Sequence, residues 1–86
     1  MSIKNREQII KNTRHLLRAR RLALGLSMNR TGEKAGLSQQ TISYVERGLR
    51  DPTLGTLLRI CEALDINMSE ILISAEDKDT HTKPIP

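Results

Sequence analysis

Glycine and proline interrupt this chain at several points, and those interruptions limit the structures that it can form. Gly25 follows a long run of good helix formers, and Gly36 follows a second helical stretch, as glycines that end helices commonly do. Pro52 closes the stretch "LRDP" at 49–52, which is expected to be a loop. The pattern predicts an all-α fold, a compact bundle of five helices at 4–24, 28–35, 39–49, 54–64 and 67–73.

The size and composition allow one small domain with an aliphatic core. The chain has 86 residues, no Trp and no Phe, and Tyr44 is its only aromatic residue. No run of about 18 apolar residues is present to span a membrane, and the start "MSIKNREQII" lacks the apolar segment of a signal peptide. The single Cys61 cannot form an internal disulfide, so a reducing cytoplasm is the expected location.

Charge is distributed unevenly along the chain. Residues 1–50 hold 11 Lys and Arg against 3 Asp and Glu, a net charge of +8. Residues 51–86 hold 3 against 7, a net charge of −4. A basic N-terminal half is typical of proteins with a polyanionic partner, although surface helices rich in Lys and Arg are also common in other proteins.

Helical periodicity predicts which side chains face the core. Arg20 lies within the apolar stripe of the first helix, where its alkyl stem is expected to cover the core while the guanidinium reaches outward. Asn67 and Glu70 resemble a capping box, and residues 74–86 are expected to form a flexible polar tail. The predicted inward faces are Ile9, Thr13, Leu16, Leu17 and Leu24; Met28, Thr31, Gly32 and Ala35; and Leu54, Leu57, Leu58, Cys61 and Leu64.

The middle of the chain has the pattern of a helix-turn-helix. Ser27 is a suitable N-cap for one short helix, Gly36 ends that helix, and Ser38 caps the next. This core, residues 27–48, cannot bury its own apolar faces and therefore needs the other helices as a platform. Gly32 costs about 1 kcal/mol relative to Ala inside a helix, which suggests either that another helix approaches closely there or that this helix is weak and frayed.

The helix that starts after Ser38 has an unusual polar side. Gln39, Gln40, Ser43 and Arg47 share one arc, opposite an apolar side of Thr41, Ile42, Val45 and Leu49. A glutamine amide donates and accepts hydrogen bonds at once, which matches N6 and N7 of adenine in the major groove. An isolated Gln pair is more often only solvated, but its place after a glycine turn in a basic half-chain favours base recognition.

Several separated motifs resemble one known family. "RRLALGLS" at 20–27, "GLSQQTIS" at 36–43, "VERG" at 45–48 and "PTLGTLLRICEALDI" at 52–66 are similar to the Cro/CI-type, or XRE, helix-turn-helix domains. The resemblance covers about residues 14–73 and is greatest to the phage 434 repressor type, which also carries paired glutamines. It implies a lambda-repressor-like bundle whose third helix enters the major groove.

The resemblance also implies roles for individual residues. Arg21 and Glu46 match a structural ion pair between the first and third helices. Met28, Thr31 and Gly32 depart from the family, which commonly has Gln, Leu and Ala there. Residues that match base-contacting positions are Ser38, Gln39, Gln40, Ser43 and Tyr44, and those that match phosphate-contacting positions are Ser27, Met28, Arg47 and Arg50.

These features predict a DNA-binding transcriptional regulator, most simply a dimeric repressor of the Cro-like or controller type acting on double-stranded DNA. One recognition helix contacts few base pairs, so specificity requires two half-sites and hence a homodimer. The fifth helix is the expected dimer interface, through Met68, Ile71, Leu72 and Ile73. Such a protein is expected in the cytoplasm of a bacterium, at its nucleoid, and to be encoded by the bacterium or a phage.

The alternative function is an antitoxin, a module whose tail at 74–86 binds and masks a toxin while the domain regulates its own operon. An enzyme is not expected, because His15 and His81 are distant in sequence and have no nucleophile or carboxylate constellation beside them. The chain has no metal-ligand spacing either, and no cofactor or small-molecule ligand is expected.

Overall fold

Five helices form the described part of the chain. The computed structural model describes the backbone of residues 5–80 and the side chains of residues 5–76. No strand is present within these residues, which confirms the predicted all-α class. The helices are α1 (Arg6–Ala23), α2 (Met28–Ala35), α3 (Gln39–Arg47), α4 (Leu54–Ala63) and α5 (Met68–Thr80).

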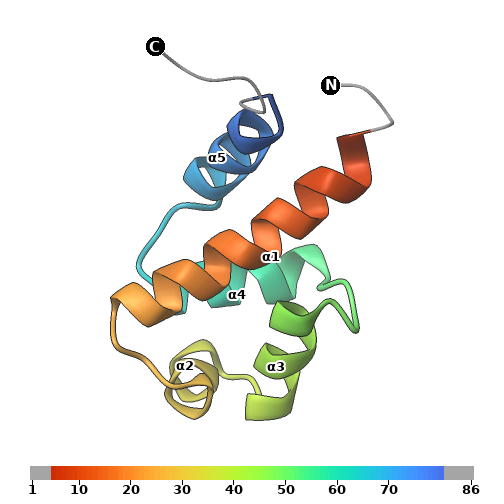
Figure 1. Cartoon of the computed structure of the whole chain (residues 1–86). Coiled ribbons are helices and arrows are strands. Elements are labelled where there is room, and N and C mark those ends of the chain that lie inside the picture. The colour runs from red at the N-terminus through yellow and green to blue at the C-terminus, as the bar shows by residue number, and fades with distance from the viewer. Residues whose placement is uncertain (1–4, 81–86) are drawn as a thin grey trace.

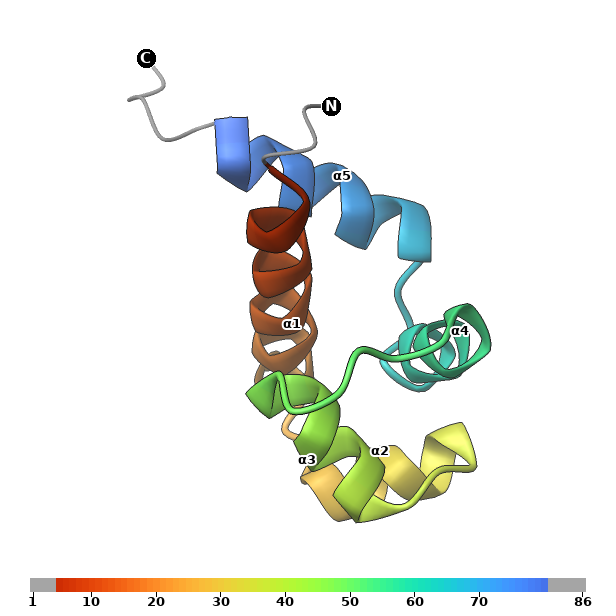
Figure 2. The same cartoon turned by 90° about the vertical axis from the view of Figure 1, so that its right-hand side faces the viewer.

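The long helix α1 supports the rest of the bundle. It packs against α5 on one side and against α3 on another, while α2 packs against α3 and α4 (Figures 1 and 2). The pair α2 and α3 therefore forms one end of the molecule, and α5 lies toward the other. This arrangement leaves one side of α3 without a neighbouring helix.

The core is aliphatic, as the composition predicts. Cys61 is buried in it, and burial raises the pKa of its thiol, which keeps the group in its unreactive neutral form. The buried cluster consists of Leu17, Ile42, Val45, Ile60, Cys61, Leu64 and Ile71.

Several leucines that the periodicity assigned to the core lie outside it. Cys61 and Leu64 are buried as predicted, but Leu54 is 64% exposed and Leu58 is 46% exposed, because α4 turns Ile60 inward in their place. That helix is apolar on most sides, so its pattern fits more than one inward face. Leu24 and Leu49 are also exposed, since both follow the last helical residue, where the repeat of 100° per residue no longer applies.

Arg20 joins α1 to the end of α4. Its Nε donates a hydrogen bond to the carbonyl oxygen of Leu64 at 2.9 Å, and its Nη2 donates to that of Asp65 at 3.0 Å. The guanidinium therefore satisfies carbonyl groups that a helix end leaves free, and its charge complements the helix dipole. This contact between helices explains why Arg20 lies within the apolar stripe of α1.

The fifth helix is longer than the sequence predicted. The expected end near Ile73 is wrong, because α5 continues to Thr80. Asn12 of α1 is buried and donates from Nδ2 to the carbonyl oxygen of Ala75 at 2.9 Å, which fixes α5 beyond the predicted end. At its start, Glu70 Oε1 accepts from the backbone N–H of Asn67 at 3.4 Å, one half of the predicted capping box. Residues 81–86 of the predicted tail lie outside the described residues.

Candidate nucleic-acid interface

A three-residue turn joins α2 to α3. Gly36 ends α2 in the left-handed conformation, with φ of 70°, which glycine adopts without strain. The backbone N–H of Leu37 donates to the carbonyl oxygen of Gly32 at 2.8 Å, and the Ser38 hydroxyl accepts from the N–H of Thr41 at 3.0 Å. These bonds satisfy the end of one helix and the start of the next, so the angle between them is fixed locally.

Gly32 is required by this turn. A Cβ added to Gly32 would lie 2.6 Å from the carbonyl oxygen of Leu37, much closer than real contacts allow. The expected neighbour was another helix, and the actual neighbour is the turn backbone itself. Beside it, Thr31 is fully buried and donates from Oγ1 to the carbonyl oxygen of Ser27 at 2.8 Å. The departures from the family pattern at 31 and 32 thus fit a closely packed turn.

The two sides of α3 differ as predicted in their polarity. Ile42 and Val45 are buried in the core, whereas Gln39, Gln40 and Arg47 are exposed. An open hollow on the surface is lined by residues from the start of α2 and from the polar side of α3. Its lining is Met28, Ser38, Gln39, Gln40, Ser43, Tyr44 and Arg47.

A buried ion pair fixes α3 against α1. Arg21 donates from Nε to Glu46 Oε2 at 2.6 Å and from Nη2 to Oε1 at 2.9 Å, and both side chains are almost fully buried. The same guanidinium donates from Nη1 to the carbonyl oxygen of Leu26 at 2.8 Å. The hydrogen bond with Glu46 raises the pKa of Arg21, although burial acts in the opposite direction. Arg21 therefore stays charged, and its contacts join α1, α3 and the turn before α2.

Two further arginines of α1 approach the end of α3. Arg18 Nε lies 4.0 Å from Glu46 Oε1, and Arg14 Nη1 donates to the backbone carbonyl oxygen of Glu46 at 3.5 Å. The Arg14 guanidinium also covers Gly48, where an added Cβ would lie 2.7 Å from its Cζ. Sequence reasoning missed Arg14 and Arg18. Successive spacings of four and three residues place Arg14, Arg18 and Arg21 on one helix face, and that spacing was the available signal.

Of the four residues that match phosphate-contacting positions, Met28 and Arg47 line the hollow. Ser27 caps α2 by accepting from the N–H of Arg30 at 2.9 Å, while Met28 packs partly against the core. The N-terminus of α2, with its unpaired backbone N–H groups, therefore lies at the edge of the polar side of α3. Arg47 and Arg50 are both exposed, at the end of α3 and in the loop after it.

Tyr44 connects two of the predicted contact residues. Its hydroxyl accepts a hydrogen bond from Gln40 Nε2 at 2.6 Å, and the guanidinium of Arg50 lies over its ring, with Cζ 4.9 Å from the ring centre. The structure thus places Tyr44 in direct contact with both Gln40 and Arg50.

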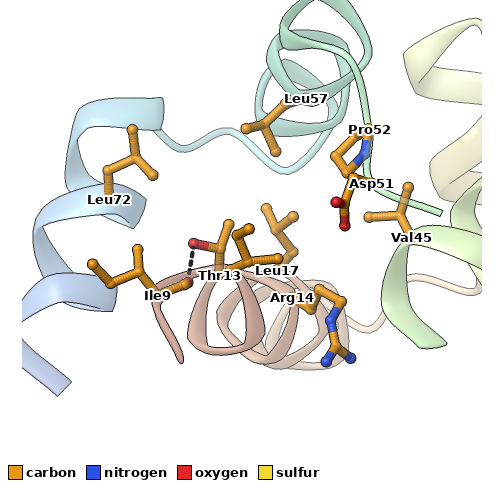
Figure 3. Close-up of a pocket in the computed structure, with 10 residues that line it drawn as sticks. Ile9, Thr13, Arg14, Leu17, Val45, Asp51, Pro52, Leu57 and Leu72 are labelled. Carbon is orange, nitrogen blue, oxygen red and sulfur yellow. Dashed lines mark hydrogen bonds between the residues drawn. The ribbon is translucent and has the colours of Figure 1, made fainter. Parts of the chain in front are cut away.

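An apolar pocket opens between α1, α4, α5 and the loop after α3 (Figure 3). Leu57 of α4 and Leu72 of α5 point toward it from opposite sides. Arg14 and Asp51 are the charged residues at its edge.

Within residues 5–80 no helix has the length and apolar character needed to cross a membrane.

The chain has clear sequence relatives. It is 34% identical over 68 residues to the HTH-type transcriptional regulator YgzD of Bacillus subtilis, covering 79% of this chain and 98% of that protein. It is 40% identical over 52 residues to the HTH-type transcriptional regulator y4dL of Sinorhizobium fredii, covering 60% of this chain and 26% of that protein. It is 32% identical over 63 residues to the transcriptional regulator ClgR of Mycobacterium tuberculosis, covering 73% of this chain and 56% of ClgR.

A solved structure shares the fold. A mutant of the restriction–modification controller protein C.Esp1396I superposes with a TM-score of 0.79 at 19% identity, over 87% of this chain and 97% of that one. A family model described as helix-turn-helix matches residues 17–71, which include the whole of α2, α3 and α4. The chain therefore belongs to the XRE-type helix-turn-helix family, whose members include transcriptional regulators.

Proposed function

We propose that the chain is a sequence-specific regulator that binds double-stranded DNA and represses transcription as a dimer. The observation that carries this proposal is the exposed pair Gln39 and Gln40 at the start of α3, on the side opposite Ile42 and Val45. With its apolar side held by the bundle, α3 presents these two exposed side chains to base edges in the major groove. Its place of action is then the chromosomal DNA in the cytoplasm.

The charged groups around α3 support the same geometry. Arg47 carries positive charge at the C-terminal end of α3 and Arg50 in the loop after it, and the N-terminus of α2 offers backbone N–H groups beside the start of α3. Groups of this kind contact phosphates and fix the register of a recognition helix, while the amides distinguish the bases. Repression then follows from occupancy of a promoter alone.

The dimer is supported by apolar surface on α5. Ile73 is 58% exposed, and Leu72 is half-buried beside the apolar pocket of Figure 3. One residue of the expected interface is withdrawn: Ile71 is 3% exposed and belongs to the monomer's own core, so a partner has no access to it. The proposed interface therefore keeps Met68, Leu72 and Ile73, and each subunit contacts one half of a pseudo-palindromic operator.

The antitoxin alternative loses part of its basis. It assigned toxin binding to a flexible tail at 74–86, but α5 includes residues 74–80 and the contact between Asn12 and Ala75 holds that region on α1. The DNA-binding surface needs no such tail, so direct regulation is the function that the geometry supports better.

The test replaces each amide separately. Gln39→Ala and Gln40→Ala are each expected to cost about 1–3 kcal/mol of binding to the preferred duplex, because a bidentate amide–base pair is lost. Binding to random duplex is expected to change little. Ser74→Ala, an exposed substitution on α5, is the control and is expected to change neither affinity. Equal losses on preferred and random DNA would contradict base recognition by these amides.

A further inference from the structure

The only aromatic residue of the chain stands between a candidate base contact and a candidate phosphate contact. Tyr44 lies one helical turn after Gln40, so both side chains lie on the same face of α3. Its hydroxyl accepts from Gln40 Nε2 at 2.6 Å, and its ring lies 4.9 Å from Cζ of Arg50. One side chain therefore contacts two groups that the proposed function uses for different purposes.

We propose that Tyr44 is a positioning residue, not a base-contacting one. Its hydroxyl orients the amide of Gln40 toward a base edge, and its ring holds the guanidinium of Arg50 beside the DNA backbone. The inference rests on the proposed function, and it changes the role expected for Tyr44 from the family resemblance.

The hydrogen-bonding groups of the glutamine amide explain how the Tyr44 hydroxyl can orient Gln40. Glutamine has two N–H donors and one carbonyl acceptor, and one N–H of Gln40 is bound to Tyr44. The second N–H and the carbonyl remain available, which are the groups that pair with N7 and N6 of adenine. A free glutamine must give up its rotamer freedom when it binds a base. The bond to Tyr44 restricts that freedom beforehand, and it strengthens when DNA excludes water from the surface.

The position of the Tyr44 ring explains how it can hold the guanidinium of Arg50. Tyr44 is half-buried and borders a depression between α3 and the following loop, which is lined by Val45, Pro52 and Thr53 among others. The ring of Tyr44 is therefore less exposed than the side chain of Gln40. Arg50 is exposed in the loop, and attraction between its guanidinium and the ring face restricts where that charge lies.

A double-mutant cycle tests the hydroxyl. Tyr44→Phe removes the hydroxyl and keeps the ring, and it is expected to weaken binding to the preferred duplex roughly three- to tenfold. Discrimination should fall at the base pair contacted by Gln40, while affinity for random duplex and the salt dependence stay unchanged. In a Gln40→Ala background, Tyr44→Phe is expected to have no further effect. A full loss in that background would show that the hydroxyl contacts DNA itself, and no loss in the wild-type background would show that it orients nothing. Either result overturns the proposed orientation of Gln40 by the Tyr44 hydroxyl.

A second cycle tests the ring. Tyr44→Leu also releases Arg50, so it should weaken binding to random duplex beyond the effect of Tyr44→Phe and flatten the salt dependence in the direction that Arg50→Ala does. In an Arg50→Ala background that additional loss should disappear, and its persistence would overturn the role of the ring.

Different results would overturn the positioning role of Tyr44 and the proposed function. Additive costs in a protein that still selects its DNA sequence overturn the positioning role alone. A wild-type protein that selects no sequence overturns the proposed function and this inference together.

Discussion

Arg21 and Glu46 place two opposite charges among the buried residues, beside an aliphatic core. Removing a charge from water is costly, so such a pair contributes less to stability than its short distances suggest. Its geometric effect is larger, because a bidentate contact allows one orientation of α3 on α1. The pair therefore determines how the polar side of α3 is presented.

Breaking this pair is expected to be strongly destabilising. Glu46→Gln leaves the Arg21 charge buried without its partner, and the free energy of unfolding should fall by about 3–5 kcal/mol in urea titrations. The matched control is Glu33→Gln, since Glu33 pairs with Arg30 at 3.2 Å on the exposed surface of α2. That change should stay within about 1 kcal/mol. A similar loss for both variants would contradict the structural role of the pair.

Single residues differed in how far the sequence revealed their partners. Ser27, Gly36 and Ser38 act within a few residues of their own position, so local patterns predicted them well. The partner of Arg21 was indicated only by the family resemblance, because no local rule joins positions 21 and 46. Arg20 was expected to point outward, and its contacts with Leu64 and Asp65 depend on where α4 ends relative to α1.

For the helices too, features that depend on nearby residues were predicted better than features that depend on residues distant in the sequence. The five helices and the N-caps Ser27 and Ser38 followed from local signals. The end of α5 did not, because the contact of Asn12 with Ala75 crosses from α1. The inward face of α4 was misassigned in part, since Cys61 and Leu64 are buried as predicted but Leu54 and Leu58 are not. Leu54 and Leu58 fit the repeat as well as Ile60 does, and only the packing partners decide among them.

The helix-turn-helix should not tolerate a methyl group at Gly32. Gly32→Ala places Cβ against the turn backbone, and such overpacking costs about 1–3 kcal/mol. The higher helix propensity of Ala offsets at most about 1 kcal/mol, so thermal unfolding should show a less stable protein.

Gly55→Ala in α4 is the matched control for Gly32→Ala. The nearest neighbour of its added Cβ is Thr53 Oγ1 at 4.0 Å. That variant should be stabilised by about 0.4–1 kcal/mol. Equal stabilisation of both variants would show that the turn is not closely packed at Gly32.

The whole assembly is expected to depend on the apolar surface of α5. Ile73→Glu should lower the dimer fraction in sedimentation experiments, because it places a charge in an apolar contact. DNA binding should then require a higher protein concentration, with the fold unchanged, since Ile73 is exposed in the monomer. Leu22→Glu is the control, as Leu22 is a similarly exposed apolar residue on α1. A dimer that is unaffected by Ile73→Glu would place the interface elsewhere.

Selection of bound duplexes from a random DNA library at low ionic strength tests the central claim most directly, because it requires no assumption about the operator. A protein that presents the amides of α3 to the major groove from two subunits is expected to enrich a pseudo-palindrome. Its half-sites should lie about one helical turn apart, roughly 34 Å between centres. Recovery of a random pool after repeated rounds would contradict the assignment of α3 as a recognition helix.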